Sequence, residues 1–299
     1  MTADFRAGFA CFVGRPNAGK STLTNALVGQ KVAIMSDRPQ TTRHAVRGIV
    51  HRPDAQLVLV DTPGFHKPRT LLGERLNDVV RSTLAEVDLI GFCIPADEKV
   101  GPGDRYIAEE LRKVAGRTPV VAIVTKTDKV RRDVVGERLV EVAELGDWAD
   151  VVPVSAREGF QVALLADLFT SRLPVSPPLY PDGELTDEPE AVMVAELIRE
   201  AALAGVRDEL PHSIAVVVEE MSQREGRDDL VDIEAVMFVE RDSQKGIVIG
   251  PRGERLKRVG SESRRQIEAL LGSKVYLDLR VKVAKDWQRD PKQLRRLGF

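Results

Sequence analysis

The chain contains little cysteine and little histidine, with two and four residues respectively among 299. Cys11 and Cys93 both lie within apolar runs. We therefore expect two buried, reduced thiols, and a disulfide between them is the alternative. Neither cysteine has a companion at the spacing of metal ligands, and the histidines form no such spacing either. The sequence thus offers no zinc-type motif.

The chain also lacks a long hydrophobic run. No stretch approaches the roughly 20 continuous apolar residues of a transmembrane helix. Residues 1–6 contain no secretory apolar segment, which predicts a cytoplasmic protein. Apolar residues make up 43% of the chain, and its 299 residues are enough to bury the cores of two domains.

Charge is distributed unevenly. The net charge of −2 says little by itself, but residues 1–180 carry +2, residues 181–240 carry −13 and residues 241–299 carry +9. A basic end of this kind indicates a surface for a polyanion such as a nucleic acid. The alternative is a basic face that is merely solvated.

Residues 14–21 form a complete phosphate-binding loop motif, Gly-x-x-x-x-Gly-Lys-Ser. Gly14 and Gly19 allow the backbone to wrap so that successive N–H groups point at the phosphates of a nucleoside triphosphate. We expect Lys20 to reach the β and γ oxygens, and the hydroxyl of Ser21 to ligate Mg²⁺.

The first 175 residues alternate apolar runs with periodic segments. The phosphate-binding loop lies between an apolar run, 8–13, and a helical pattern, 22–28, which is the context that the motif requires. The alternation predicts an α/β domain, residues 1–175, with a mostly parallel sheet covered by helices. The other expected strands are 56–60, 87–94, 119–124 and 151–154, and expected helices include 104–114, 133–145 and 162–172.

Prolines separate this region from a second one. Four prolines occur among residues 173–183, where neither a helix nor a central strand is expected. We predict a Pro-rich linker, residues 176–189, followed by a smaller α+β domain with a C-terminal tail, residues 190–299. Its expected elements have the order αββααβ: a helix over 190–209, strands over 212–221 and 232–241, two helices ending near 271, and a strand over 274–283.

A polar tetrapeptide follows the expected strand 56–60. Asp61, at a strand end beside a phosphate-binding loop, is expected to hold Mg²⁺. Gly64, three residues later, can bring its N–H to the γ-phosphate. The alternative is an ordinary Asp-Thr-Pro-Gly turn.

Two further polar motifs follow strands. Thr-Lys-Thr-Asp at residues 125–128 and Ser-Ala-Arg at residues 155–157 come after the third and fourth of these strands. Together with Gln-Thr-Thr-Arg at residues 40–43, they have the order and spacing typical of GTPases of the translation-factor-like class. The alternative for residues 125–128 is a strand-end turn.

In such a site Asp128 accepts from guanine N1–H and the 2-amino group, a pattern that adenine does not offer. Lys126 lies along the base and braces the phosphate-binding loop, and Ala156, next to Ser155, gives its N–H to guanine O6. The usual motif has Asn where this chain has Thr125, and a hydroxyl is shorter and lacks a second donor. We predict weaker nucleotide affinity with guanine choice preserved.

Two positions concern hydrolysis. One threonine of the 40–43 motif is expected to ligate Mg²⁺ when the γ-phosphate is present and to leave after hydrolysis. Thr42 is favoured, Thr41 is the second choice, and a polar loop without a ligand role is the alternative. Phe65 stands where Ras-like enzymes have a water-positioning Gln, so slow intrinsic turnover is expected. Resemblance to GTPases with the same change gives Asn17 a role in holding K⁺, against the alternative of a plain loop residue.

A second glycine pair, Gly250 and Gly253, occurs in the basic C-terminal region, residues 241–299. Within the αββααβ order it resembles the loop of a type II KH domain, in which the glycine backbone approaches the sugar-phosphate chain and clamps about four nucleotides. Ile247, Ile249 and Leu256 are expected to line or support an apolar groove for the bases. The alternative is a structural turn on a domain that binds nothing. The expected RNA-binding residues are Ile249, Gly250, Pro251, Arg252, Gly253, Arg255, Lys257 and Arg258.

A GTPase domain joined through a Pro-rich linker to a KH domain resembles the Era family of bacterial GTPases over nearly the whole chain. The matching segments are residues 14–22, 40–44, 61–65, 209–213 and 287–299. The resemblance implies binding of the 3′ end of small-subunit ribosomal RNA, GTP-gated assistance in maturing that subunit, and some peripheral association with the inner membrane. Thr125, and Pro251 with Arg252, depart from the family's pattern. A monomer is expected.

Motifs and resemblance together predict GTP or GDP, Mg²⁺ and K⁺ as ligands. The expected nucleotide contacts are Gly14, Asn17, Ala18, Gly19, Lys20, Ser21, Thr22, Asp61, Gly64, Thr125, Lys126, Asp128, Ser155 and Ala156. The expected catalytic residues are Lys20, Thr42, Gly64 and Asn17, and the expected metal ligands are Ser21, Thr42 and Asp61.

Three other functions compete with a GTPase whose nucleotide state controls RNA binding. The first is an RNA-binding adaptor with a weakly active nucleotide site and no role in ribosome assembly, which Thr125 and Phe65 favour. The second is an ATPase, which Asp128 argues against. The third is a membrane-bound signalling GTPase, but the polar face of the helix 190–209 is acidic, and anionic lipid would repel it.

Overall fold

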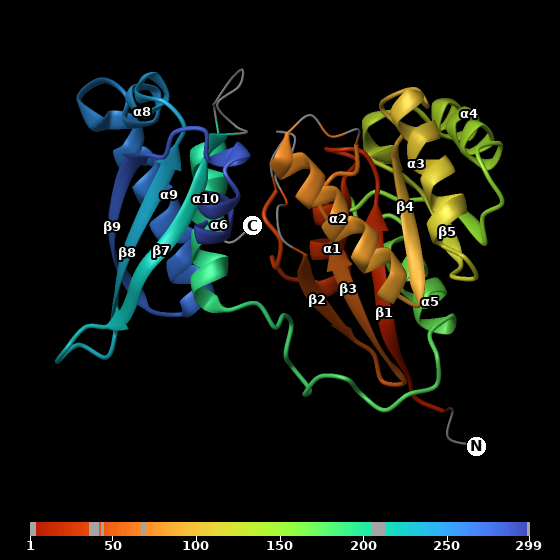
Figure 1. Ribbon diagram of the computed structural model, residues 1–299. Coiled ribbons are helices and arrows are strands. Elements are labelled where there is room, and N and C mark those ends of the chain that lie inside the picture. The colour runs from red at the N-terminus through yellow and green to blue at the C-terminus, as the bar shows by residue number, and fades with distance from the viewer. Residues whose placement is uncertain are drawn as a thin grey trace. The chain divides into compact units, whose positions relative to one another are not determined.

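The chain forms two compact units, the first ending at Asp187 and the second beginning at Glu188 (Figure 1). The computed structural model describes residues 4–35, 42, 45–66, 68, 70–204 and 213–297. Of the 40–43 motif only Thr42 lies within this part, and Thr41 lies outside it. The segments 205–212 and 298–299, which include parts of the Era-like motifs, also lie outside the described residues.

A six-stranded sheet forms the centre of the first unit, in the order β2-β3-β1-β4-β5-β6. All neighbouring pairs are parallel except β2 with β3, which confirms the mostly parallel sheet. Every residue of β3 and β4 is buried, as expected for strands covered on both faces. The strands are β1 (Arg6–Val13), β2 (Val46–His51), β3 (Ala55–Asp61), β4 (Leu89–Pro95), β5 (Val120–Thr125) and β6 (Asp150–Pro153).

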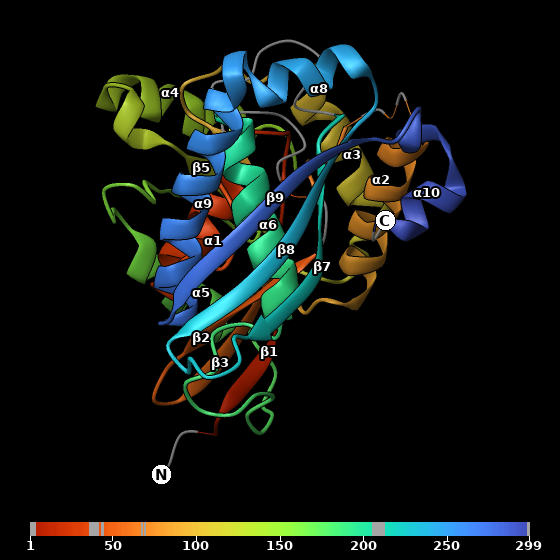
Figure 2. The same cartoon turned by 90° about the vertical axis from the view of Figure 1, so that its left-hand side faces the viewer.

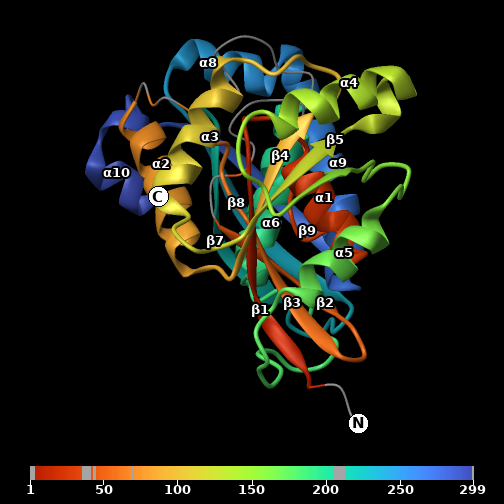
Figure 3. The same cartoon turned by 90° about the vertical axis from the view of Figure 1, so that its right-hand side faces the viewer.

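Helices cover both faces of this sheet (Figure 3). Ala10 and Phe12 of β1 pack with α1 and α5, whereas Cys11 and Val13, which alternate with them, pack with α2, α3 and α4. The helices are α1 (Lys20–Val28), α2 (Leu71–Glu86), α3 (Pro102–Val114), α4 (Arg132–Ala143) and α5 (Val162–Ser171), with a short 3-10 helix η1 (Thr127–Lys129).

The two cysteines are free thiols on neighbouring strands, Cys11 on β1 and Cys93 on β4. Both side chains are fully buried. Burial raises the pKa of Cys11 far above its usual value and that of Cys93 to about 12.

The Pro-rich segment packs along the edge of the first sheet. Gln56 of β3, only 1% exposed, accepts from the N–H groups of Leu179 at 2.7 Å and Tyr180 at 2.9 Å, and its Nε2 donates to the Tyr180 carbonyl at 2.9 Å. Arg47 of β2 pairs with Asp187 at 2.8 Å. The segment is therefore held against the first unit as far as Asp187.

The second unit is a three-stranded sheet in the order β7-β8-β9, with β8 antiparallel to β7 and parallel to β9. Its strands cross in front of α6 in Figure 2. Val194 and Ile198 of α6, Ile233 and Met237 of β8 and Ile267 of α9 belong to its buried core. The elements are α6 (Glu190–Leu203), β7 (Ala215–Gln223), β8 (Leu230–Val239), α8 (Asp242–Ile249), η2 (Pro251–Gly253), α9 (Glu254–Leu271) and β9 (Lys274–Val283). The predicted αββααβ order is confirmed. The chain therefore has a phosphate-loop domain followed in sequence by a KH-type domain.

Two short helices follow β9, η3 (Trp287–Arg289) and α10 (Pro291–Arg296). Trp287 is fully buried, and its indole N–H donates to the carbonyl of Ser213 at 3.1 Å. This indole therefore ties the C-terminal residues to the start of the strand pair β7–β8. Across the described ranges, no helix is both long enough and apolar enough to pass through a membrane.

Candidate nucleotide site and nucleic-acid groove

The phosphate-binding loop leaves β1 and enters α1, as its motif predicts. Gly19 has φ +91° and Asn17 has φ +64°, so both lie in the left-handed region that turns N–H groups inward. A Cβ on Gly14 would lie 2.5 Å from the carbonyl oxygen of Cys93, so no larger residue fits there. The loop therefore needs its first glycine for packing and its second for backbone conformation.

Lys20 is buried inside this loop, with only 6% of its surface exposed. Its Nζ donates to the carbonyls of Gly14 at 3.2 Å and Arg15 at 3.1 Å. Burial lowers the pKa of Lys20, and the nearby Asp61 carboxylate opposes that shift. Phosphate oxygens placed in the loop would strengthen the opposition and favour the charged ammonium.

The three predicted metal ligands lie together. Ser21 Oγ donates to Asp61 Oδ2 at 2.7 Å, Thr42 Oγ1 donates to the same oxygen at 3.1 Å, and the two hydroxyls are 3.0 Å apart. Among the described residues no partner reaches the second oxygen of Asp61, Oδ1, although it is buried. Burial raises the pKa of Asp61 despite these hydrogen bonds. A hard cation with oxygen ligands would compensate this carboxylate, so the cluster fits Mg²⁺.

Gly64 lies directly against the phosphate-binding loop. A Cβ there would lie 2.8 Å from Pro16 Cγ, and the next residue, Phe65, donates its N–H to the Gly14 carbonyl at 3.1 Å. The Phe65 ring is 2% exposed and packs 5.8 Å from the Tyr106 ring, so this side chain is buried in the core rather than placed to polarise water.

Two polar residues that sequence reasoning missed support this segment. His66 Nδ1 lies 2.8 Å from the Gly64 carbonyl oxygen, which accepts when that nitrogen is protonated. Asn77 of α2, 1% exposed, donates from Nδ2 to the His66 carbonyl at 2.8 Å. No short motif marks Asn77, because its partner is a backbone group eleven residues away.

The base-reading motifs meet at the carboxyl ends of β5 and β6. Thr125 Oγ1 donates to the Ala18 carbonyl at 2.6 Å, so its hydroxyl supplies a direct link to the phosphate-binding loop. Lys126 passes beside the same loop, since a Cβ on Gly19 would lie 3.9 Å from its Cγ. Ser155, 1% exposed, donates to Asp128 Oδ1 at 2.6 Å. This bond orients the carboxylate that is expected to read guanine, and Ala156 follows directly.

Arg15 connects the phosphate-binding loop to α3, a link that the motif does not predict. Its Nε donates to the buried carboxylate of Asp104 at 2.7 Å and its Nη1 pairs with Glu98 at 2.9 Å. Asp104 also accepts from the Gly101 N–H at 2.9 Å, at the start of α3. The two acidic partners lie more than 80 residues away in sequence, so no local pattern reveals them.

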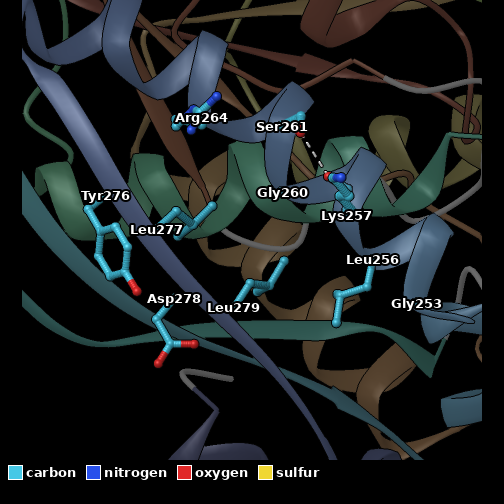
Figure 4. A pocket seen from close by; sticks show the side chains of 10 residues that line it. All are labelled: Gly253, Leu256, Lys257, Gly260, Ser261, Arg264, Tyr276, Leu277, Asp278 and Leu279. Carbon is cyan, nitrogen blue, oxygen red and sulfur yellow. Dashed lines mark hydrogen bonds between the residues drawn. The ribbon is translucent and has the colours of Figure 1, made fainter.

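The second glycine loop joins α8 to α9. Gly250 has φ +72°, Arg252 φ +51° and Gly253 φ +77°, so three of its four residues have left-handed φ values. A groove of about 530 Å³ begins at Gly253 and runs between α9 and β9 (Figure 4). Its lining residues are Gly253, Leu256, Lys257, Gly260, Ser261, Arg264, Tyr276, Leu277, Asp278 and Leu279.

Only part of the predicted RNA set borders this groove, namely Gly253 and Lys257, with Leu256 among the expected apolar supports. Ile249 packs against the core of the second unit, and Ile247 is 54% exposed outside the lining. Arg255 Nη2 donates to the Ala202 carbonyl at 3.1 Å and also to Ala204, at the C-terminal end of α6.

Sequence reasoning missed the wall that β9 supplies, Tyr276 to Leu279. The clear alternation of that strand predicts a sheet, but alternation does not show which strand stands opposite the glycine loop. The +9 charge was the usable signal, but it is spread over residues 241–299, β9 included, and so marks neither wall of the groove.

These two sites define a phosphate-loop GTPase joined to a KH domain. The sequence matches the family described as "50S ribosome-binding GTPase" over residues 9–126 and the family described as "KH domain" over residues 209–288. It is 72% identical to GTPase Era of Streptomyces coelicolor, with 98% of this chain and 95% of that protein covered. It is 68% identical to GTPase Era of Mycolicibacterium smegmatis, with 99% of each covered. The chain belongs to the Era family of GTPases.

Solved structures agree. A structure of Era in complex with MgGDPNP and nucleotides 1506–1542 of 16S ribosomal RNA matches with a TM-score of 0.94 at 35% identity, covering 98% of this chain and 99% of the other. A variant of Aquifex aeolicus Era bound to GDP·AlF4⁻ matches with a TM-score of 0.93, also at 35% identity, with the same coverage.

Asp61→Asn should stabilise the nucleotide-free first unit at neutral pH by about 1–3 kcal/mol, because it removes a buried, half-paired charge. The folded-state pKa of Asp61 is raised, so the wild type loses stability as pH rises from the ordinary aspartate value of about 4 through that raised pKa. The gain in the variant should therefore vanish near pH 4. Urea unfolding in a chelator across pH measures it.

The exposed Asp182→Asn is the matched control and should change the unfolding free energy by less than about 0.5 kcal/mol. The same Asp61→Asn chain should lose Mg²⁺-dependent nucleotide binding. Equal unfolding free energies of wild type and Asp61→Asn from pH 5 to 8 would show that burial of the charged Asp61 carboxylate does not destabilise the first unit.

Thr125→Val should raise the dissociation constant for GDP about tenfold, because it leaves the Ala18 carbonyl without its donor at unchanged side-chain shape. Thr125→Ser keeps the hydroxyl and should stay within about threefold of wild type. In all three proteins GTP, but not ATP, should displace bound fluorescent GDP, since Asp128 is intact. Displacement by ATP as effective as by GTP would refute guanine choice through Asp128.

Proposed function

We propose that this GTPase uses its nucleotide state to control binding of RNA in the KH groove, and that the RNA is the 3′ end of small-subunit ribosomal RNA during maturation of that subunit. The observation that carries the proposal is that one chain holds both the Ser21–Thr42–Asp61 cluster and the groove that starts at Gly253. The similar Era structure, which covers nearly all of both chains, carries MgGDPNP and 16S ribosomal RNA together.

At the nucleotide site, Lys20 and the loop N–H groups hold the phosphates, and the N–H of Gly64 faces the γ-phosphate. Ser21, Thr42 and Asp61 hold Mg²⁺, which offsets the charge that develops on the phosphates. Because Phe65 is buried, no side chain at that position positions water, and turnover is slow. The guanine contacts come from Lys126, Asp128, Ser155 and Ala156, while Thr125 acts through Ala18.

Thr42 is the proposed nucleotide sensor. Its hydroxyl is held beside Ser21 and Asp61 by hydrogen bonds that are each about 3 Å long. Loss of the γ-phosphate removes the ligand that favours this position, so Thr42 leaves the metal site. The proposed domains are 1–175 and 190–299, joined by 176–189.

In the groove, Gly253 lets the RNA backbone approach closely and Lys257 contacts a phosphate, while Arg252 and Arg258, which lie outside the groove lining, contact phosphates that flank it. All three basic side chains are exposed. Arg255 is occupied by the end of α6, so its part in RNA binding is to position the glycine loop. We further propose a cytoplasmic monomer with weak peripheral membrane contact, limited by the acidic Glu190 and Glu200 of α6.

Gly253→Asp tests the RNA site. The full chain with Mg²⁺ and GDPNP should bind an RNA of the sequence of nucleotides 1506–1542 of 16S ribosomal RNA, and this change should weaken binding at least tenfold by blocking approach and repelling phosphate. Gly226→Asp in the β7–β8 turn is the matched control, because that glycine also has φ near +73° and open space at its Cβ. It should stay within about twofold of wild type.

The same RNA should accelerate phosphate release from GTP in the wild type and in Gly226→Asp, but not in Gly253→Asp. An adaptor with a weakly active nucleotide site predicts binding without acceleration. Equal binding by both variants would instead refute the groove as the RNA site.

Asn17 is the proposed K⁺ residue, since it belongs to the phosphate-binding loop and has a left-handed φ of +64° there. K⁺ should therefore raise the turnover of GTP over that in Na⁺ by about tenfold or more, and Asn17→Ala should abolish the difference. Equal phosphate release in KCl and NaCl by the wild type would overturn this part of the proposal.

A further inference from the structure

Gly260 lies in the interior of α9 without a structural reason to be glycine. A Cβ built there meets no heavy atom within 4 Å, and its φ is not in the left-handed region. The helix continues for eleven residues to Leu271, and Gly272 forms its C-terminal cap. Alanine would therefore fit, and would favour the helix more than glycine does.

Two other helical glycines share this property but not the location. Gly136 in α4 and Gly246 in α8 also have open space at the Cβ position. Neither borders the groove between α9 and β9, whereas Gly260 does. Substitutions at Gly136 and Gly246 therefore change helix propensity alone, whereas substitutions at Gly260 change both helix propensity and the wall of the groove.

Gly260 sits at the middle of the helix wall of that groove. Leu256, Gly260 and Arg264 are spaced by four residues and so lie on one face of α9, with Lys257 beside them. Leu277 and Leu279 extend from β9 toward this face (Figure 4). The helix wall is thus apolar at Leu256 and has no side chain at Gly260. Lys257 and Arg264 make it cationic on the two sides of that glycine.

The hydroxyl next to the bare turn is already engaged. Ser261 Oγ donates to the Lys257 carbonyl at 2.9 Å, within the helix. A nucleotide bound at this turn therefore contacts the helix backbone and a hydroxyl that already has a hydrogen-bond partner. The cationic groups of Lys257 and Arg264 lie on the same helix, where they can contact phosphates. A sugar or base at this turn would therefore bind through van der Waals contact with the helix and not through hydrogen bonds.

We propose that Gly260 is a steric window of the RNA groove: the ribose or base of a bound single-stranded nucleotide packs directly on the α9 backbone at Gly260, at a distance that leaves no room for a methyl group. The inference rests on the proposed RNA site and extends it to a residue outside the glycine loop. Close approach of the ligand explains why this position holds glycine although alanine would stabilise the helix, because glycine alone leaves room for that approach.

The test is a graded series, Gly260→Ala and Gly260→Leu, with Gly246→Ala and Gly136→Ala as matched controls. All four changes introduce good helix formers into open space, so each chain should fold. Each alanine should raise the melting temperature of its own unit, by roughly 4–8 °C in the second unit and roughly 2–4 °C in the larger first unit. Binding is measured with the full chain, Mg²⁺, GDPNP and the RNA of nucleotides 1506–1542.

Gly260→Ala should melt higher and yet bind this RNA about tenfold more weakly, and Gly260→Leu should bind more weakly still. Gly246→Ala and Gly136→Ala should melt higher with RNA affinity within about twofold of wild type. Intrinsic GTP turnover without RNA should be unchanged in all four. The opposite signs of the stability and affinity changes are specific to a ligand window.

Unchanged affinity in both Gly260 variants would overturn the inference, and so would a lower melting temperature of Gly260→Ala, which would reveal a structural need for glycine. Failure of the RNA site itself is distinguished by Gly253→Asp. If that variant loses binding while the Gly260 series does not, the groove holds RNA without the window; if it also keeps binding, the proposed site is wrong.

Discussion

A single buried carboxylate holds the nucleotide site together. Asp61 stands at the end of β3 and receives hydroxyl donors from α1 through Ser21 and from the segment around Thr42. Its other oxygen is unpaired among the described residues, and burial raises the pKa of the carboxylate. A bound cation would favour the charged form. A cation bound with the nucleotide would offset this cost of burying the carboxylate, so the cost favours a metal-bound nucleotide.

Both units place glycine backbone beside a lysine at the sites where phosphate is expected to bind. In the first unit Gly14 and Gly19 bracket a loop that buries Lys20 against its own carbonyls. In the second, Gly253 opens a groove in which Lys257 stays exposed. The buried lysine suits a ligand of fixed shape enclosed by the protein. The exposed lysine suits a longer chain that passes along the surface.

The sequence predicted the parts whose chemistry requires fixed spacing. The phosphate-binding loop, Asp61 and Asp128 each combine a local pattern with a strand end, and the parallel sheet then brings them to one edge. It missed β2 and α2, since β2 is an edge strand interrupted by Arg47 and Gly48 rather than a continuous apolar run. It also missed the β9 wall and the bonds of Arg15 and Arg255, because those partners are set by tertiary packing. That Thr125 weakens nucleotide affinity stays a prediction, and its hydroxyl makes a local bridge to the Ala18 carbonyl.

The two thiols of the first sheet have a practical consequence. Cys11 and Cys93 are wholly buried and their pKa values are raised, so neither forms the thiolate that reacts with maleimides or disulfide reagents at neutral pH. The wild-type chain is in effect cysteine-free toward such labels. Single cysteines introduced on the exposed surfaces of the two units can therefore carry a fluorophore pair without any change to the native core, and the separation between the units can be followed in solution through one cycle of GTP binding and hydrolysis.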